Sequence, residues 1–117
     1  EGPTRWLALR REALADGICD ASILCRYETV LRPEDRQWQD WLDGQRQKIE
    51  RALDRLEQEV ASFPVLPDIG QIAVAVALGY RDFRFAEEDW RASRPKLAAW
   101  YEAFAERPSM RATAPVG

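Results

Sequence analysis

The sequence contains no histidine, and this absence excludes several kinds of chemistry. Among its 117 residues there are two cysteines and no histidine. Ser-His-Asp and Cys-His catalysis both need an imidazole as general base, so neither can operate within this chain. Two cysteines without histidine cannot supply the usual tetrahedral zinc site, and the Glu-x-x-His pairs of di-iron bundles are also missing. We therefore expect neither metal nor histidine chemistry from these residues alone.

Excess basic charge and long hydrophobic runs are missing as well. Seventeen basic and twenty acidic residues leave a net charge of −3, whereas nucleic-acid binding draws its energy mainly from Lys and Arg against phosphates. No segment has the ~20 apolar residues of a membrane span, and the first residues show no signal-peptide pattern. Cys19 and Cys25 fall on different faces of one predicted helix, which excludes a disulfide between them. We expect a protein of a reducing, cytoplasmic compartment, with no nucleic-acid or membrane partner.

The residues that are present suffice for one folded domain. Apolar residues make up 46% of the chain, and a domain of this size buries roughly 65% of its unfolded surface. Breaks that contain proline divide the chain into four segments and a tail that starts at Pro108. No segment remains as a strand candidate. We expect one all-α domain over residues 1–117, a bundle of four main helices with a short C-terminal tail.

The first two segments, about 4–31 and 35–62, have the helical period. One stripe of the first is spaced three and four residues apart and consists of Leu9, Ala13, Asp16, Asp20, Leu24, Tyr27 and Leu31. A second stripe consists of Leu7, Leu14, Ile18, Ala21 and Cys25, with a polar sector of Arg11, Glu12, Ser22 and Arg26 between the two. A helix with two apolar stripes should contact two neighbours. The second segment has one apolar line, which starts at Trp38, and charged residues on its other faces.

The third segment begins with a predicted helix cap. Residues 72–78 are apolar on every side, which alone fits either a buried strand or a buried helix. Asp68 stands three residues before Gln71, a capping-box arrangement in which each side chain bonds to a free backbone N–H of the other residue. Three alanines in the run also favour a helix. We expect a central helix over about 69–85 that is buried on all sides, and a fourth helix over 95–106.

Three stretches of the chain form a pattern when taken in order: residues 15–21, residues 68–72 running into 78–85, and residues 94–100 followed by 107–109 and 113–115. Together they resemble the C-terminal domain of cytosolic glutathione transferases of the bacterial type. The resemblance covers nearly the whole chain. It implies a two-domain protein whose N-terminal thioredoxin-like domain, absent from this chain, binds glutathione and activates its thiol. It also implies that the helical domain contributes to the electrophile pocket and to a homodimer interface, and is inactive alone.

Residues of the first helix are the candidates for a binding site. Asp16 and Asp20 lie one turn apart in an apolar stripe, so their like charges require a cationic partner. Arginines of this chain or of a dimer partner would satisfy them. By resemblance, Asp20, with Asp16 beside it, instead contacts the γ-glutamyl amine of glutathione bound on the partner subunit. Ile23, Leu24 and Tyr27 either pack in the core or, as the resemblance implies, line the electrophile pocket.

Three functions remain open from the sequence. The resemblance favours an enzyme module for conjugating glutathione to a small apolar electrophile, with the pKa of the thiol lowered by a group outside this chain. The alternatives are a non-catalytic helical module for dimerisation or protein binding and a stand-alone four-helix regulator, because one fold serves many functions. Five tryptophans are many for this length, and an exposed apolar patch is expected where a missing domain packs.

Overall fold

The computed structural model describes residues 2–115, and every regular element within that range is helical. The α-helices are α1 (Pro3–Arg26), α2 (Gln39–Glu59), α3 (Ile69–Arg84), α4 (Pro95–Ala105) and α5 (Pro108–Ala112). A π-helical turn at Tyr27–Leu31 extends α1, and short 3₁₀ turns at Glu34–Arg36 and Val60–Ser62 flank α2. The all-α prediction is confirmed, and the predicted tail contains one further short helix, α5.

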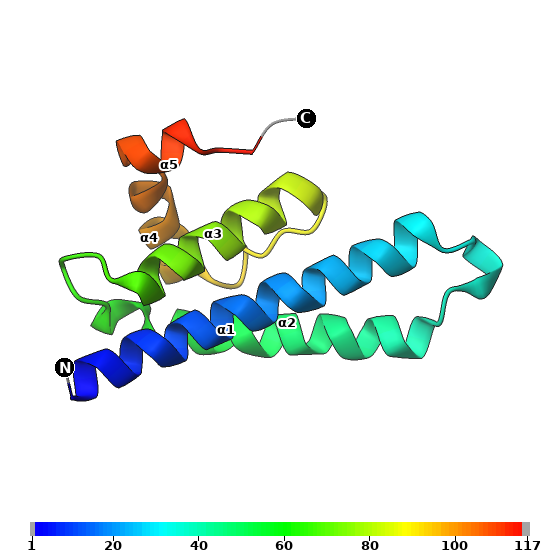
Figure 1. Cartoon of the computed structure of the whole chain (residues 1–117), viewed down its shortest axis with the longest axis horizontal. Helices are drawn as coiled ribbons and strands as arrows, with labels where there is room; N and C mark the ends of the chain where they lie inside the picture. Colours follow the sequence, from blue (N-terminus) through cyan, green and yellow to red (C-terminus); the bar gives the residue numbers. More distant parts are fainter. Residues whose placement is uncertain (1, 116–117) are drawn as a thin grey trace.

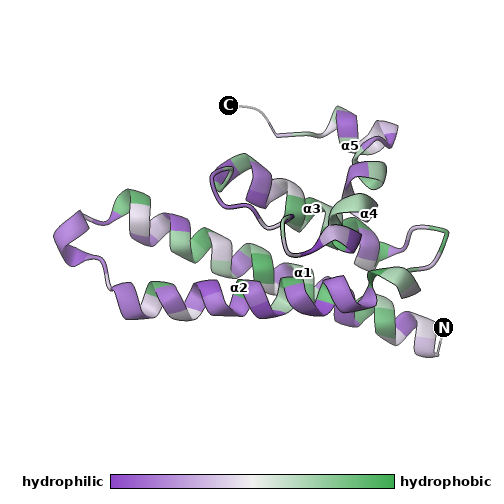
Figure 2. Ribbon diagram, turned by 180° about the vertical axis from the view of Figure 1, so that it is seen from behind, coloured by the Kyte–Doolittle hydropathy of each residue, from purple (hydrophilic) through white to green (hydrophobic). Residues whose placement is uncertain are grey.

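The longest feature of the molecule is an antiparallel hairpin of α1 and α2, with α3 along the other side of α1 (Figure 1). α3 runs parallel to α1, since Gly70 lies against Ala8 near the start of both helices, and Arg81 bonds to Ser22 further along. α4 packs against α2 and α3, and α5 follows it. Most of the α2 ribbon carries the colour of hydrophilic residues (Figure 2).

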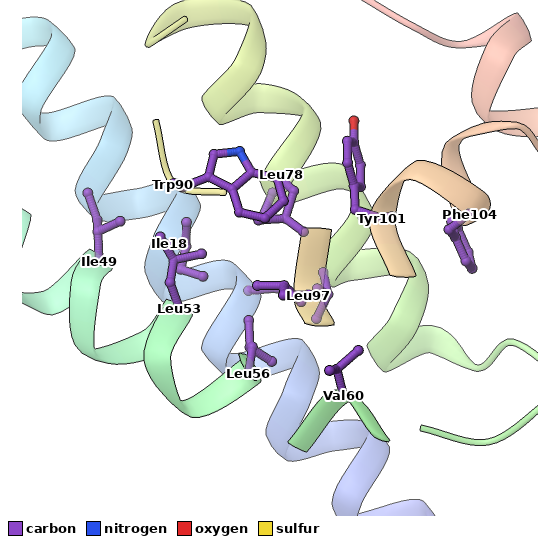
Figure 3. Close-up of a cluster of buried hydrophobic side chains, with 14 of the residues drawn as sticks. Ile18, Ile49, Leu53, Leu56, Val60, Leu78, Trp90, Leu97, Tyr101 and Phe104 are labelled. Carbon is purple, nitrogen blue, oxygen red and sulfur yellow. The ribbon is translucent and has the colours of Figure 1, made fainter. Parts of the chain in front are cut away.

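The core lies where α1, α2, α3 and α4 meet (Figure 3). Each helix contributes side chains that are at most 1% exposed, among them Ile18, Leu53, Leu56, Leu78 and Leu97. Their spacing follows the helical period that the sequence shows, because residues three and four apart share one face of a helix. These contacts fix the positions of the helices from which any binding surface must be built.

α1 and α3 approach each other closely at Gly70. A Cβ atom built on Gly70 would lie only 2.6 Å from the carbonyl oxygen of Ala8, far closer than real Cβ contacts. Only glycine therefore allows the two backbones to come this close. Buried alanines continue the contact on both helices, with Ala15 on α1 and Ala77 on α3 almost wholly inaccessible.

The predicted cap of α3 is confirmed in its first half and wrong in its second. Oδ1 of Asp68 accepts a 2.9 Å hydrogen bond from the backbone N–H of Gln71. The Gln71 side chain, however, does not return to the cap. Its amide nitrogen donates to the carbonyl oxygens of Pro64 at 2.9 Å and Leu66 at 3.3 Å. Because Gln71 is buried, it holds the preceding loop against the helix.

Two members of the polar sector of α1 are buried. Arg11 is 2% exposed and Ser22 is wholly buried. Arg11 donates from Nε to Glu59 at 3.3 Å and from Nη2 to Ser62 at 3.1 Å, at the C-terminal end of α2. Oγ of Ser22 accepts a 3.2 Å bond from the buried Arg81. Polar partners on neighbouring helices thus allow these groups to lie in the interior.

The start of α4 is capped by a side chain of α2. The carboxylate of Glu57 accepts from the backbone N–H of Leu97 at 2.7 Å and from that of Lys96 at 3.2 Å. Just before α4, the buried Arg94 donates from Nε to Asp54 of α2 at 2.9 Å. Free N–H groups of a first turn need such acceptors. The charged connector that precedes α4 is therefore anchored to the bundle.

Candidate functional site

The first predicted stripe of α1 points to solvent. We call its exposed members the outward face of α1: Ala13, Asp16, Asp20, Leu24, Tyr27 and Leu31. As expected, α1 contacts two neighbours, α2 and α3. It does so through a single buried face that includes Ala15, Ile18 and Cys25, whereas the first stripe is largely exposed. The outward face is apolar at its ends and acidic in its middle.

The two carboxylates of this face have no cationic partner in the part of the chain that the structure describes. None of the ion pairs formed within residues 2–115 includes Asp16 or Asp20. Arginines of this chain therefore do not neutralise them. Burial, together with the charges of Asp16 and Asp20, raises the pKa of the neighbouring Cys19 thiol. Cys19 stays protonated at neutral pH and is a poor nucleophile.

Leu24 and Tyr27 continue the outward face toward the C-terminal end of α1. Leu24 is 42% and Tyr27 56% exposed, so core packing explains neither of them. Ile23 is half-buried at the edge of the same face. Because residues three and four apart share a helix face, Asp20, Leu24 and Tyr27 lie side by side. α1 alone thus brings a carboxylate and an apolar patch together.

α3 has an open apolar face, although the sequence predicted burial on all sides. We call this the outward face of α3: Ile69, Ile72 and Val76, which are 49%, 45% and 53% exposed. Their spacing of three and four residues places them on one side of the helix. Val74 and Leu78, on the opposite side, are fully buried. The prediction failed because an apolar sequence on every side does not show which side has a neighbour.

A cleft of about 570 Å³ adjoins this face, between α3, α4 and the C-terminal segment. Its walls include Val76, Tyr80 and Phe83 of α3 and Tyr101 of α4, and residues 110, 111 and 113–115 close one side. The Tyr101 hydroxyl lies where a Cβ on Gly79 would approach it to 3.2 Å. Burial raises the pKa of Tyr101, which keeps the hydroxyl protonated. None of the predicted pocket residues on α1 lines this cleft.

The one aspartate of the cleft is already engaged by the connector that precedes α4. Asp82 accepts two 2.8 Å hydrogen bonds from the guanidinium of Arg91 and a 3.0 Å bond from the indole of Trp90. Trp90 is buried, so it belongs to this domain's own core. Trp6 and Trp38 are exposed, so Trp38, which starts the apolar line of α2, does not pack in the core of this chain.

The described residues show neither a metal centre nor a disulfide. No group of three or more His, Cys, Asp or Glu side chains in residues 2–115 could hold a metal ion. Cys19 and Cys25 are both free, as predicted. No helix of the described chain is long and apolar enough to cross a membrane.

The chain matches the model of one known protein family. Residues 39–103 match the model described as glutathione S-transferase, C-terminal domain. A GST-like protein of Escherichia coli, YibF, which has no characterised function, is 38% identical over 117 residues. That alignment covers 97% of this chain and 57% of YibF. The chain therefore spans just over half the length of this relative.

Solved structures give the same result. A glutathione transferase family member from Pseudomonas fluorescens Pf-5, crystallised with bound glutathione, is 52% identical and superposes with a TM-score of 0.96. The match covers all of this chain and 58% of that one. A glutathione S-transferase from Methylobacterium radiotolerans, in complex with glutathione sulfonate, is 36% identical with a TM-score of 0.86, over 94% of this chain and 53% of that one. The chain belongs to the glutathione S-transferase family and corresponds to its C-terminal domain.

Proposed function

We propose that this chain is the C-terminal half of a glutathione transferase and that its α1 helps to bind both substrates. The outward face of α1 carries the proposal, because it presents unpartnered carboxylates beside an exposed apolar patch. Structures similar to this chain hold glutathione or glutathione sulfonate. In the whole protein, a preceding thioredoxin-like domain would hold most of the glutathione molecule.

Charge complementarity supports the role of Asp20. The γ-glutamyl end of glutathione carries an ammonium group, and a hydrogen bond from an ammonium to a carboxylate is among the stronger ones in proteins. Asp16, one turn earlier, adds negative charge to the same face. Because the carboxylates point away from this chain's own core, we propose that Asp20 reaches glutathione bound on the other subunit of a homodimer.

The apolar part of the same face suits the second substrate. Leu24 and Tyr27, with Ile23 at the edge, offer a surface for a small apolar electrophile one turn from Asp20. The glutathione thiolate would attack that electrophile. As the resemblance to the family implies, the group that lowers the pKa of the glutathione thiol would lie in the preceding domain and not in this chain. We expect the chain alone to be inactive.

The test is glutathione binding by the two-domain protein, measured by titration calorimetry. Asp20→Ala and Asp20→Asn each remove one charged partner of a hydrogen bond, so we expect the Kd for glutathione to rise about tenfold or more. Asp35→Asn, at an exposed aspartate of the hairpin tip, is the matched control and should leave the Kd unchanged. Equal affinity in all three variants would reject the role of Asp20.

The wild-type protein decides between the enzyme and the non-catalytic alternatives left open by the sequence. Binding of glutathione, followed by conjugation of an apolar electrophile, supports the enzyme. If the intact gene product has a mass of only 13.5 kDa, or is longer and binds no glutathione, the enzyme is rejected. The non-catalytic helical module for dimerisation or protein binding then takes its place.

A further inference from the structure

We propose that a groove between α4 and the loop over residues 63–67 binds a small aromatic carboxylate. The groove encloses about 320 Å³, enough for a compound of one or two rings. It shares no lining residue with the cleft beside α3 or with the outward face of α1. The inference therefore goes beyond the proposed function and does not depend on it.

The first observation is an aromatic wall whose rings hold one another in place. Trp100 of α4 meets Phe63 edge to face, with ring centroids 5.2 Å apart, and its ring centroid lies 5.0 Å from that of Phe104. The guanidinium of the buried Arg11 lies 4.7 Å from the centroid of Phe63. Because these contacts restrict the rings before a ligand arrives, binding costs them little rotational freedom. A wall of this kind suits a flat aromatic ring.

The second observation is that the loop side of the groove is also held in place. Pro64 and Pro67 both line the groove, and each proline ring fixes its own backbone φ angle. The buried Gln71 donates from Nε2 to the carbonyl oxygens of Pro64 and Leu66 and so ties the loop to the start of α3. The groove is therefore formed before binding, which is usual for small-molecule sites.

The third observation is an arginine without a carboxylate partner at the same wall. The guanidinium of Arg107, just after α4, lies 5.3 Å from the ring centroid of Phe104. Arg107 forms no ion pair within residues 2–115, and the neighbouring Glu106 pairs with Arg111 instead. The described lining of the groove includes neither Asp nor Glu. A ligand carboxylate would give Arg107 a bidentate partner while its ring packs on the aromatic wall.

The experiment titrates 2-naphthoate into the whole protein that contains this chain and follows binding by calorimetry. The amide 2-naphthamide, which has the same rings without the charge, is the matched ligand. We expect 2-naphthoate to bind with a Kd on the order of 0.1 mM. The amide should bind about tenfold more weakly, because it cannot replace the charged hydrogen bonds to Arg107. Absence of 2-naphthoate binding, or equal binding of the two compounds, overturns the inference.

Two arginine variants locate the charge that binds the carboxylate. Arg107→Gln should raise the Kd of 2-naphthoate about tenfold and leave that of 2-naphthamide unchanged. Arg51→Gln removes the same charge from an exposed arginine on the outer side of α2, which forms no ion pair within residues 2–115, and should change neither Kd. Equal losses in the two variants would mean that overall charge attracts the ligand, and would overturn the inference.

A second pair of variants fills the groove without changing the core. Ala103 is exposed on α4 and lines the groove, whereas Ala99, one turn earlier, is exposed and does not line it. Ala103→Leu should raise the Kd of 2-naphthoate about tenfold or more, because leucine occupies the space of the ring, and Ala99→Leu should bind like the wild type. Leucine also favours a helix, so both variants should melt within about 2 °C of the wild type. Unchanged binding by Ala103→Leu would place the ligand elsewhere and overturn the inference.

Discussion

α2 and α3 both pack along α1, yet their other sides differ. The side of α2 away from the core carries charged, solvent-exposed residues: Lys48, Glu50, Arg51, Asp54 and Arg55. The corresponding side of α3 carries aliphatic residues at the same helical spacing. The C-terminal end of α2 is joined to α1 by charged contacts, whereas α3 is joined to α1 by close packing at Gly70.

This difference separates two reasons for a helix to be apolar. The inner sides of α2 and α3 are apolar because they form the core of this chain, and burial there contributes stability in proportion to area. The outer side of α3 is apolar without contributing to that core. Mutations on the inner sides should therefore lower the stability by similar amounts in the two helices. Matched mutations at other positions should have different effects in α2 and in α3.

The largest effects should come from the inner sides. Leu78 of α3 and Leu53 of α2 are both wholly buried in one core. Leu78→Ala and Leu53→Ala each remove three buried carbon atoms and leave a cavity, so each should reduce the free energy of unfolding by about 2–5 kcal/mol. Urea denaturation of the 117-residue chain measures both. A loss below about 1 kcal/mol at Leu78 alone would mean that α3 is held by a different surface.

Acid should weaken the attachment of α2 to α1. Burial by itself raises the pKa of Glu59, but hydrogen bonds from Arg10, Arg55 and Arg11 outweigh it and lower this pKa to about 2. A carboxyl with a lowered pKa in the folded state stabilises above its unfolded pKa. That stability is lost as pH falls from about 4.5 toward 2. Because Arg11 is buried while Arg10 and Arg55 reach water, we expect a total loss of about 2 kcal/mol.

Other carboxyls also protonate in this range, so the comparison needs a variant that lacks only this charge. Glu59→Gln should be less stable than the wild type at pH 7, and the two proteins should converge as the pH falls toward 2. The difference between their unfolding free energies, measured by urea denaturation at several pH values, isolates the contribution of Glu59. A constant difference across that range would show that the stabilisation from the contacts between the arginines and Glu59 does not depend on the charge of Glu59.

The helices could be predicted from the sequence because their signals are local. Helical spacing, proline breaks and the Asp68 cap lie within a few residues of what they determine, and all four main helices follow them. The burial of Arg11 and Ser22 could not be predicted in this way. Their partners are 48 to 59 residues away in the chain, and a charged or polar residue at a helical position looks the same whether it faces water or a distant carboxylate.

The candidate site was only partly predictable for a related reason. The spacing of Asp16, Asp20, Leu24 and Tyr27 placed them correctly on one face of α1. It did not show that this face points to solvent. An apolar stripe has the same sequence pattern whether it packs against a helix of this chain or against another chain. The same ambiguity hid the open side of α3. An apolar face that this chain leaves uncovered can be recognised only in the folded structure, because the sequence does not show which apolar faces are buried.

A pair of glycines tests the close packing that is special to α3. Gly70→Ala places a Cβ against the carbonyl of Ala8 and should reduce the free energy of unfolding by about 1–3 kcal/mol. Gly44 of α2 is the control, since a Cβ there meets no atom within 4 Å. Gly44→Ala should raise stability by about 0.5–1 kcal/mol, because alanine favours the helix. The same sign for both changes would contradict the tight crossing of α1 and α3.

The smallest expected effect is at the start of α3, where Asp68 supplies a side-chain cap and the corresponding Trp38 of α2 supplies none. Asp68→Ala removes the acceptor for the N–H of Gln71 and should cost about 1 kcal/mol, seen as a fall of about 4 °C in melting temperature. Asp68→Asn keeps an acceptor oxygen and should melt within about 1 °C of the wild type, since asparagine caps as well as aspartate. Of the two Asp68 oxygens, only Oδ1 forms a hydrogen bond within residues 2–115. If Asp68→Asn lost as much as Asp68→Ala, the negative charge near the helix N-terminus, rather than this hydrogen bond, would be what stabilises the first turn.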